Sequence, residues 1–161
     1  GSLINTITMT YGGSTRPSCS ITNLADDDKT HFFYNSYNYN PSSENDSFIK
    51  FDFGENIKVD LYSYFICTND GEIDDCHPKS WRIEGSNDDL KWSDIDKRED
   101  EKSLLGQYKY QLFKCNLLIH GNVNNRFRYI RYVQEDSWMK ECPYKVCLTF
   151  FELYGYVFKN K

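Results

Sequence analysis

Cysteine and histidine are the residues of this chain whose types and spacing suit metal chemistry. Cys76 stands next to His77, and Cys142 and Cys147 enclose four residues in the stretch CPYKVC. Cys and His are preferred zinc ligands, but four intervening residues lie at the wide end of zinc-knuckle spacing. The sequence therefore favours free thiols over a zinc site, and it leaves a Cys142–Cys147 disulfide open in an oxidising setting.

The other cysteines point to buried thiols. The chain has six cysteines, an even count that permits disulfides, but Cys67 and Cys115 lie inside apolar runs. A free cysteine in such a run packs like a small hydrophobic residue. We therefore expect reduced cysteines, as in an intracellular protein.

The three histidines offer little to a catalytic mechanism. His31, His77 and His120 lie outside any recognisable nucleophile motif. A Ser-His-Asp or Cys-His site needs a nucleophile held by a positioned base. No Gly-rich phosphate loop is present in the sequence either. The sequence therefore predicts that the protein is not an enzyme.

Charge and length exclude other classes of function. The chain has 161 residues, a net charge of −5 and a pI near 5.2. This acidic balance argues against a nucleic-acid surface and disfavours an anionic membrane as partner. No apolar run is long enough to span a bilayer. Gly1-Ser2 resembles a cloning remnant, so we expect 3–158 to be one domain of a larger multidomain protein, with 159–161 as a tail.

The composition and the alternating patterns of the chain predict an all-β domain. Aromatic residues make up 17% of it and alanine is nearly absent, a composition that favours strands over helices. In 48–66, Ile49, Phe51 and Phe53 share one face, and the Gly54–Asn56 turn then begins a second alternating strand. Two more strands are expected at 126–133 and 146–158. The second of these is almost continuously apolar, which predicts either burial on both faces or a central position in a sandwich.

The segment 80–95, SWRIEGSNDDLKWSDI, is the most distinctive part of the sequence. Trp81 and Ile83 alternate with charged residues, a polar turn follows, and Leu90 and Trp92 alternate again. It lacks the register of an EF-hand loop. We therefore expect a hairpin whose tryptophans point into the core, with Gly85 and Asn87 serving its turn.

Long polar segments separate the expected strands. They span 34–46, 68–79, 97–109 and 134–145. Several strands joined by such turns suggest a β-sandwich or jelly roll. The loops of a sandwich gather at its ends, where binding surfaces commonly lie.

Several segments of the chain, in their sequence and their order, resemble a known family. HPKSWRIEGSNDDLKWSDID (77–96), FRYIRYVQ (127–134) and FFELYGY (150–156) resemble the coagulation factor 5/8 type C, or discoidin-like, domain. The segments 24–33 and 47–66 match its earlier strands in the same order. In sequence the chain is most similar to the intracellular branch of this family, which is found in protist multidomain proteins and beside BTB domains.

The resemblance implies a galactose-binding-like jelly-roll β-sandwich that is not an enzyme. Its relatives bind carbohydrates, phospholipids or proteins through loops at one end. Secreted members often join the two chain ends with a disulfide, whereas here the outermost cysteines are Cys19 and Cys147, and Cys147 lies inside the last strand. This difference favours an intracellular location over a secreted one.

The resemblance also implies a structural calcium ion, since carbohydrate-binding relatives hold one at the place of the acidic run Asp26-Asp27-Asp28. The matching residues here are Asp26 or Asp28 together with Glu152. Hard oxygen ligands of this kind suit Ca²⁺. The relatives form a tight turn at this place with an Asp-Gly pair, whereas this chain has Asp26-Asp27. A solvated acidic loop is therefore the favoured interpretation.

Aromatic and polar loop residues are the candidate ligand contacts. An exposed tryptophan can stack on a sugar or anchor a protein partner, but Trp138 can equally close the end of the sandwich as a core plug. Relatives that bind carbohydrate combine an aromatic, an Arg or Asn and a His in their loops. Trp138, His77 and Asn69 match that combination here. Tyr37 and Tyr39 in the first long loop and Lys140 beside Trp138 are further candidate contacts.

The sequence leads to two main hypotheses of function. The first is an interaction module that binds a protein partner through its loop end. The alternative is a carbohydrate-binding module for a galactose-type glycan, with a structural calcium ion. Membrane lipid ranks last, because acidic residues offset the two lysines near Trp138, Lys140 and Lys145.

Overall fold

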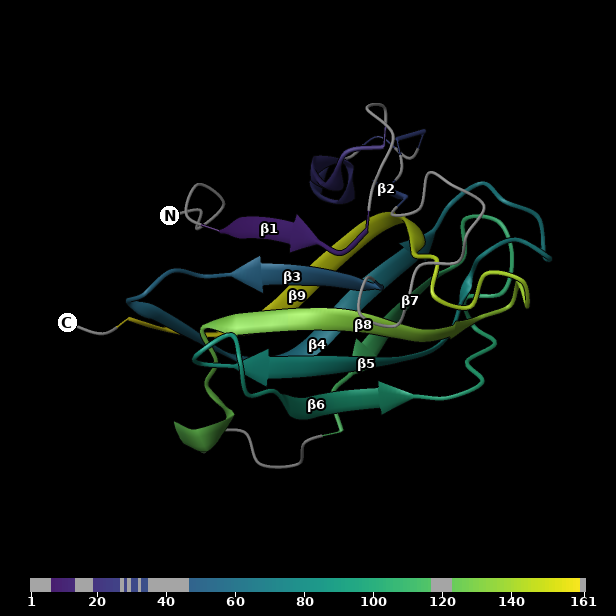
Figure 1. Cartoon of the computed structure of the whole chain (residues 1–161). Helices are drawn as coiled ribbons and strands as arrows, with labels where there is room; N and C mark the ends of the chain where they lie inside the picture. The colour runs from purple at the N-terminus through teal and green to yellow at the C-terminus, as the bar shows by residue number, and fades with distance from the viewer. Residues whose placement is uncertain are drawn as a thin grey trace.

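The computed structural model describes residues 7–13, 19–26, 28, 30–31, 33–34, 47–116 and 123–159. These residues form a jelly-roll β-sandwich of two antiparallel sheets (Figure 1), with strand orders β1-β3-β8-β5-β6 and β2-β9-β4-β7. No helix among them is long and apolar enough to cross a membrane. The elements are β1 Thr8–Tyr11, η2 Ile21–Ala25, β2 Phe33–Tyr34, β3 Phe48–Asp52, β4 Ile57–Thr68, β5 Pro78–Ser86, β6 Ser93–Arg98, β7 Tyr110–Lys114, η4 Val123–Asn125, β8 Tyr129–Ser137 and β9 Cys147–Lys159.

The predicted alternation of β3 and β4 is confirmed. Ile49, Phe51 and Phe53 are all buried in the core, and so are Val59 and Leu61 of β4. Gly54 joins the two segments with a φ of +89°, a left-handed conformation that glycine adopts without strain. The period of two therefore placed these side chains on the correct face.

Aromatic rings fill the centre of the sandwich. Trp81 of β5 packs edge-on against Phe113 at a centroid distance of 5.1 Å, and Tyr64 of β4 stacks on Phe151 at 6.1 Å. The indole Nε1 of Trp81 donates a hydrogen bond of 2.9 Å to the Tyr64 hydroxyl. The polar atoms of both rings thus have partners inside an otherwise apolar core.

The last strand, β9, only partly follows its prediction. Burial on both faces holds for 147–151, but Tyr156 is 61% exposed and Val157 is 41% exposed. Burial on both faces is therefore wrong for this second half, whereas the central position is confirmed, because β9 lies between β2 and β4. There β9 pairs with the first part of β4, in which Val59, Asp60 and Leu61 remain buried.

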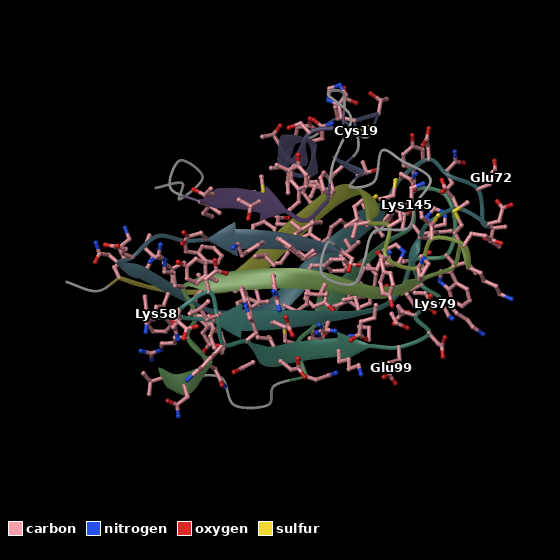
Figure 2. All side chains as sticks on the ribbon, viewed as in Figure 1. Cys19, Lys58, Glu72, Lys79, Glu99 and Lys145 are labelled. Carbon is pink, nitrogen blue, oxygen red and sulfur yellow. The ribbon has the colours of Figure 1, made fainter. Side chains whose placement is uncertain are left out.

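Three of the predicted loops gather at one end of the sandwich, which we call the loop end (Figure 1). They are the β4–β5 loop (69–77), the β6–β7 loop (99–109) and the β8–β9 loop (138–146). Figure 2 labels Glu72, Lys79, Glu99 and Lys145 at or near this end, and Lys58 at the opposite end. The fourth predicted loop, 34–46, lies outside the described residues apart from its first residue.

The β5–β6 hairpin is confirmed, but its second strand begins later than predicted. Trp81 and Ile83 are fully buried, whereas Leu90 is 83% exposed and precedes β6. Trp92 is half-buried, and the Arg131 guanidinium lies 3.9 Å from the centroid of its ring. The inward placement of Leu90 and Trp92 was wrong, because the polar turn extends through them.

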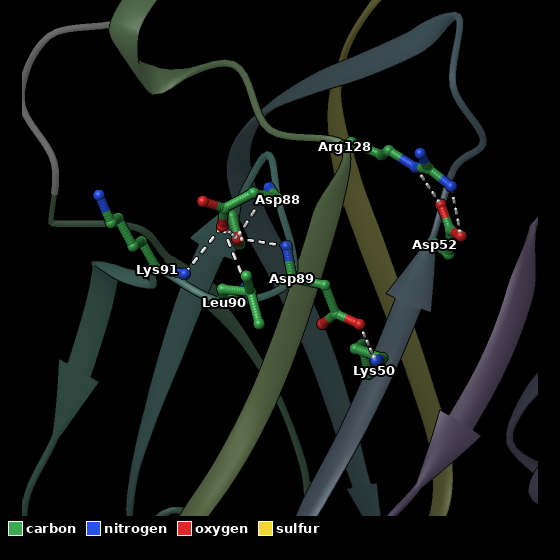
Figure 3. A network of polar contacts seen from close by, with 8 residues as sticks. Lys50, Asp52, Asp88, Asp89, Leu90, Lys91 and Arg128 are labelled. Carbon is green, nitrogen blue, oxygen red and sulfur yellow. Dashed lines mark hydrogen bonds and ion pairs between the residues drawn. The ribbon is translucent and has the colours of Figure 1, made fainter.

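Short polar side chains build this turn (Figure 3). The Asp88 carboxylate accepts hydrogen bonds from the backbone NH groups of Leu90 and Lys91, at 2.9 and 2.8 Å. Asp89 adopts a positive φ of 60° and forms an ion pair with Lys50 of β3 at 2.7 Å. The acidic run therefore serves the turn and the neighbouring strand, as the hairpin hypothesis predicted.

Gly85 has a different role from the one predicted. It lies within β5, and a Cβ atom there would stand 2.2 Å from the ring of Phe127. Asn87, the residue nearest the turn, donates to the Arg126 carbonyl and accepts from the Arg128 NH group, each at 3.1 Å. Gly85 is thus needed for a close approach of Phe127, and Asn87 fastens the hairpin to the start of β8.

Candidate functional site

The β4–β5 loop buries two of the predicted ligand residues. His77 is 0% exposed, and its Nε2 donates to the carbonyl groups of Gly71 and Glu72 at 3.1 and 2.7 Å. Asn69 is 5% exposed, and its amide Nδ2 lies 3.4 Å from Asp75 Oδ2. Both side chains therefore shape the loop from inside and have no surface to present to a ligand.

Trp138 begins the β8–β9 loop and is half-buried. Its indole Nε1 donates to the Glu101 carbonyl at 3.2 Å, and its backbone NH donates to the His77 carbonyl at 3.0 Å. One tryptophan thus ties all three loops of the loop end together. The ring is held in one orientation while part of it remains open to solvent.

Charged side chains surround this indole. Lys79 Nζ lies 5.5 Å from the centroid of the Trp138 ring and forms ion pairs with Asp136 at 2.7 Å and Asp100 at 3.5 Å. The hydrogen bond to Asp136 raises the pKa of Lys79. Lys140, the other predicted cation, is exposed two residues after Trp138. Cationic, anionic and aromatic groups therefore share one small surface.

The predicted calcium ligands have other partners. Asp26 and Asp28 lie on either side of His31, at 3.0 Å from Nδ1 and 3.7 Å from Nε2 respectively. The Asp26 hydrogen bond raises the pKa of His31, and hydrogen bonds from Thr30 lower the pKa of Asp28. Within the described residues, no three His, Cys, Asp or Glu side chains form a group suited to a metal ion.

Glu152, the third predicted calcium ligand, is exposed on β9. Its carboxylate accepts a short hydrogen bond from the Tyr154 hydroxyl, which raises the pKa of Tyr154 to about 12. Tyr37 and Tyr39, predicted as ligand contacts, lie outside the described residues. The structure thus places Trp138, Lys79 and Lys140 at the loop end, and the described residues offer no side-chain cluster for a calcium ion.

All six cysteines are buried and form no disulfide, in agreement with the predicted thiols. Cys76 donates through its Sγ to Asp75 Oδ1 at 3.1 Å. Burial raises the pKa of Cys115 to about 12, so its thiol stays protonated at neutral pH. Cys142 and Cys147 form no disulfide with each other, and the free-thiol hypothesis fits better than the zinc alternative.

An open groove of about 450 Å³ adjoins the loop end. It follows the seam where β6, the edge of one sheet, meets β7, the edge of the other. Most of its lining side chains are polar, and the β6–β7 loop contributes two of them. The groove is lined by Arg98, Glu101, Ser103, Gln111, Leu112, Phe113, Lys114 and Asn116.

A buried chain of hydrogen bonds fixes one wall of this groove. The Tyr64 hydroxyl, which accepts from Trp81 in the core, donates to Asp96 Oδ2 at 2.6 Å. The same carboxylate, 0% exposed, accepts from Arg98 Nε at 2.8 Å. Arg98 also donates to the Lys114 carbonyl at 2.6 Å. Burial, followed by the nearby Asp96 charge, raises the pKa of Tyr64 well above its ordinary value.

None of the groove residues was among the predicted site residues. One signal was available, because Asp96 and Arg98 are two positions apart in a strand and so share a face. An Asp and an Arg on one face of an edge strand can form a pair at the sheet margin. Their meeting with β7 depends on how the two sheets stack, which is a long-range feature.

Comparisons with known proteins add information about the fold. No family model matches the chain, and no curated protein matches it in sequence. Solved structures do match. CBM32-3 of a family 31 glycoside hydrolase from Clostridium perfringens aligns with a TM-score of 0.68 at 14% identity, covering 94% of this chain and 92% of that one.

Two further structures agree. CBM62 of Xyl5A from Clostridium thermocellum aligns with a TM-score of 0.63 at 18% identity, covering 93% of both chains. CBM32-5 of CpGH89 from Clostridium perfringens, in complex with GalNAc-β-1,3-galactose, aligns with a TM-score of 0.64 at 11% identity, covering 93% of this chain and 96% of that one. At these identities the similarity shows the fold alone, a jelly-roll β-sandwich that this chain shares with these modules.

Proposed function

We propose that this domain is a non-catalytic carbohydrate-binding module that holds a galactose-type glycan at the loop end. The predicted alternative is thereby preferred to the protein-partner hypothesis, which no comparison supports. The similar structures are binding modules of glycoside hydrolases, and one of them is in complex with a galactose-containing disaccharide. Fold alone does not assign a ligand, so the proposal depends on the surface of this chain.

The observation that carries the proposal is the fixed and partly open indole of Trp138. Its Nε1 is committed to the Glu101 carbonyl, so the ring cannot turn inward without breaking that hydrogen bond. A held aromatic face can stack on the apolar face of a sugar ring at little entropic cost. Lys79, Asp100 and Lys140 lie at or near the indole and supply donors and acceptors for sugar hydroxyl groups.

No calcium ion is included in the proposal. Asp26 and Asp28 are engaged by His31 and Thr30, and Glu152 is engaged by Tyr154. A calcium ion would have to displace these partners and gather the carboxylates at one point.

A glycan array followed by calorimetric titration tests the proposal. We expect binding to galactose and GalNAc-β-1,3-galactose, and we expect Trp138→Ala to weaken it at least about tenfold through loss of the stacking face. Trp92→Ala is the matched control, because Trp92 is also half-buried but belongs to the hairpin turn at the opposite end. Equal losses in both variants, or an array with no bound glycan, would overturn the proposal.

One observation favours a protein partner as a second candidate. The outer face of the four-stranded sheet exposes a set of aromatic residues, with Tyr110 at 65% and Tyr156 at 61% exposure. Tyr110 stacks on Phe65 at 5.9 Å, and Tyr156 packs on Tyr62 at 5.4 Å. Aromatic residues are enriched at the centres of protein interfaces. A photo-crosslinking residue at 110 that yields no protein adduct in cells would remove this candidate.

A further inference from the structure

Two cysteines from distant parts of the sequence meet where the β4–β5 loop reaches the start of β9. Cys147 is the first residue of β9, and the residue after it pairs with Thr68 at the end of β4. Asn69, which follows in the chain, donates from its amide Nδ2 to Asp75 Oδ2 at 3.4 Å, and Asp75 precedes Cys76. The strand register and this contact bring the two cysteines together, although β5, β6, β7 and β8 lie between them in the sequence.

The side chains of these two cysteines are in direct contact. The thiol of Cys147 is hydrogen-bonded to that of Cys76, and this hydrogen bond, together with burial, raises the pKa of Cys147 well above its ordinary value. Cys76 in turn donates through its Sγ to Asp75 Oδ1 at 3.1 Å. The two cysteines are 0% and 1% exposed. The structure thus holds a close pair of reduced thiols at the base of the loop end.

The structure favours Cys76 over Cys142 as the partner of Cys147. The sequence left a Cys142–Cys147 disulfide open because only four residues separate them. In the structure, the NH group of Cys142 donates to the Met139 carbonyl at 3.0 Å, and its carbonyl accepts from the Ser137 hydroxyl at 2.9 Å. These contacts tie Cys142 to the end of β8, whereas the thiol in contact with Cys147 is that of Cys76.

We propose that Cys76 and Cys147 are a disulfide-forming pair, which closes when the domain folds in the presence of a small-molecule disulfide. A disulfide requires two side chains that point toward each other, and the contact between the two thiols meets this requirement. The bond joins the β4–β5 loop to β9. Because the neighbouring His77 carbonyl accepts from the Trp138 NH group, the bond also fastens the loop end beneath that indole.

The reaction is a thiol–disulfide exchange in two steps. One protein thiolate attacks the reagent disulfide, forms a mixed disulfide with one half of it and releases the other half as a thiolate. The second protein thiolate then attacks the protein sulfur of the mixed disulfide, and the remaining reagent thiolate leaves. The two protein thiols have lost two protons and two electrons, and the reagent disulfide has been reduced to two thiols.

Burial decides when this exchange takes place. Only a thiolate attacks a disulfide, and in the folded domain the raised pKa keeps Cys147 protonated while burial keeps both sulfur atoms away from the reagent. Before the β4–β5 loop packs, both thiols are open to attack. Closure therefore accompanies folding or a local opening of the loop, and the same burial afterwards shields the bond from reductants.

Refolding the reduced chain in a buffer of oxidised and reduced glutathione tests the proposal. A second arm adds the same buffer to the folded, reduced domain, so the test does not depend on the refolding yield. Free thiols are then alkylated, and the protein is digested for mass spectrometry. Cleavage after Lys145 separates Cys142 from Cys147, and cleavage beside Asp70 separates Cys76 from the preceding cysteine.

We expect the peptides of Cys76 and Cys147 to be joined, with Cys142 alkylated. The oxidised domain should melt roughly 4–16 °C above the reduced domain, because the bond restricts the unfolded chain. A Cys142–Cys147 link, or alkylation of both Cys76 and Cys147 in both arms, would overturn the proposal.

Two alanine variants sharpen this result. Cys76→Ala should leave Cys147 open to alkylation and abolish the rise in melting temperature. Cys142→Ala is the matched control, because it removes another buried thiol of the loop end and should retain both the link and the rise. Loss of the link in Cys142→Ala but not in Cys76→Ala would contradict the assignment. These measurements involve no sugar, so their outcome is independent of the proposed glycan binding.

Discussion

The loop end and the β6–β7 groove lie next to each other, yet they use polar side chains in opposite ways. At the loop end, His77 and Asn69 point inward and bind the loop itself, and Lys79 is committed to two aspartates. In the groove, Lys114 and the amides of Gln111 and Asn116 face an open hollow. A polar residue in a loop is therefore not by itself a ligand residue, and an edge strand can offer more available groups.

The two regions also differ in how far their ion pairs are buried. The Arg98–Asp96 pair has a fully buried carboxylate that continues into the core through Tyr64. The Lys79–Asp136 pair is partly exposed on both sides. The first pair should be part of the fold, whereas the second should be largely a surface feature.

The largest expected effect is on the free energy of unfolding, and it distinguishes Trp81 in the core from Trp138 at the loop end. Trp81→Ala should lower the free energy of unfolding by about 3–5 kcal/mol, because it leaves a cavity in the core and removes the donor to the Tyr64 hydroxyl. Trp138→Ala should cost far less and leave the domain folded. Urea denaturation measures both variants, and similar losses would contradict the contrast.

A smaller effect is expected when the carboxylates of the two ion pairs are compared. Asp96→Ala should cost about 3 kcal/mol, because it leaves Arg98 and the buried Tyr64 hydroxyl without their acceptor. Asp136→Ala removes a partly exposed partner of Lys79 and should cost below about 1 kcal/mol. Chemical denaturation of the two variants under the same conditions provides the comparison, and equal costs would show that burial does not separate these pairs.

The smallest expected effect concerns an exposed pair remote from both regions. His31 is hydrogen-bonded to Asp26, and its pKa is raised above 6.5. Its contribution to stability is therefore fully present below pH 6.5 and is lost as the pH rises through the raised pKa. His31→Gln should melt earlier than the unmodified protein at pH 5.5 and at the same temperature at pH 8.5. A difference that is equal at both pH values would contradict this assignment.

The sequence predicted the layers of the molecule because these depend on local periodicity. Alternation correctly placed Ile49, Phe51 and Phe53 in the core, and the polar turn correctly separated β5 from β6. It failed at Leu90 and Trp92, where a chance alternation continued past the real end of the turn. It also misread Gly85, whose role depends on Phe127, a residue 42 positions away.

The sequence by itself determined that this chain is a β-sandwich with long loops at its ends. Period-two patterns and turn residues are short-range signals, and they carry that information without the rest of the chain. Only the tertiary structure decided that His77 faces inward, that Trp138 is fastened to Glu101, and that Arg98 and Lys114 meet in one groove. These facts depend on how two sheets stack, because stacking decides which polar groups find partners inside the protein and which remain available to a ligand.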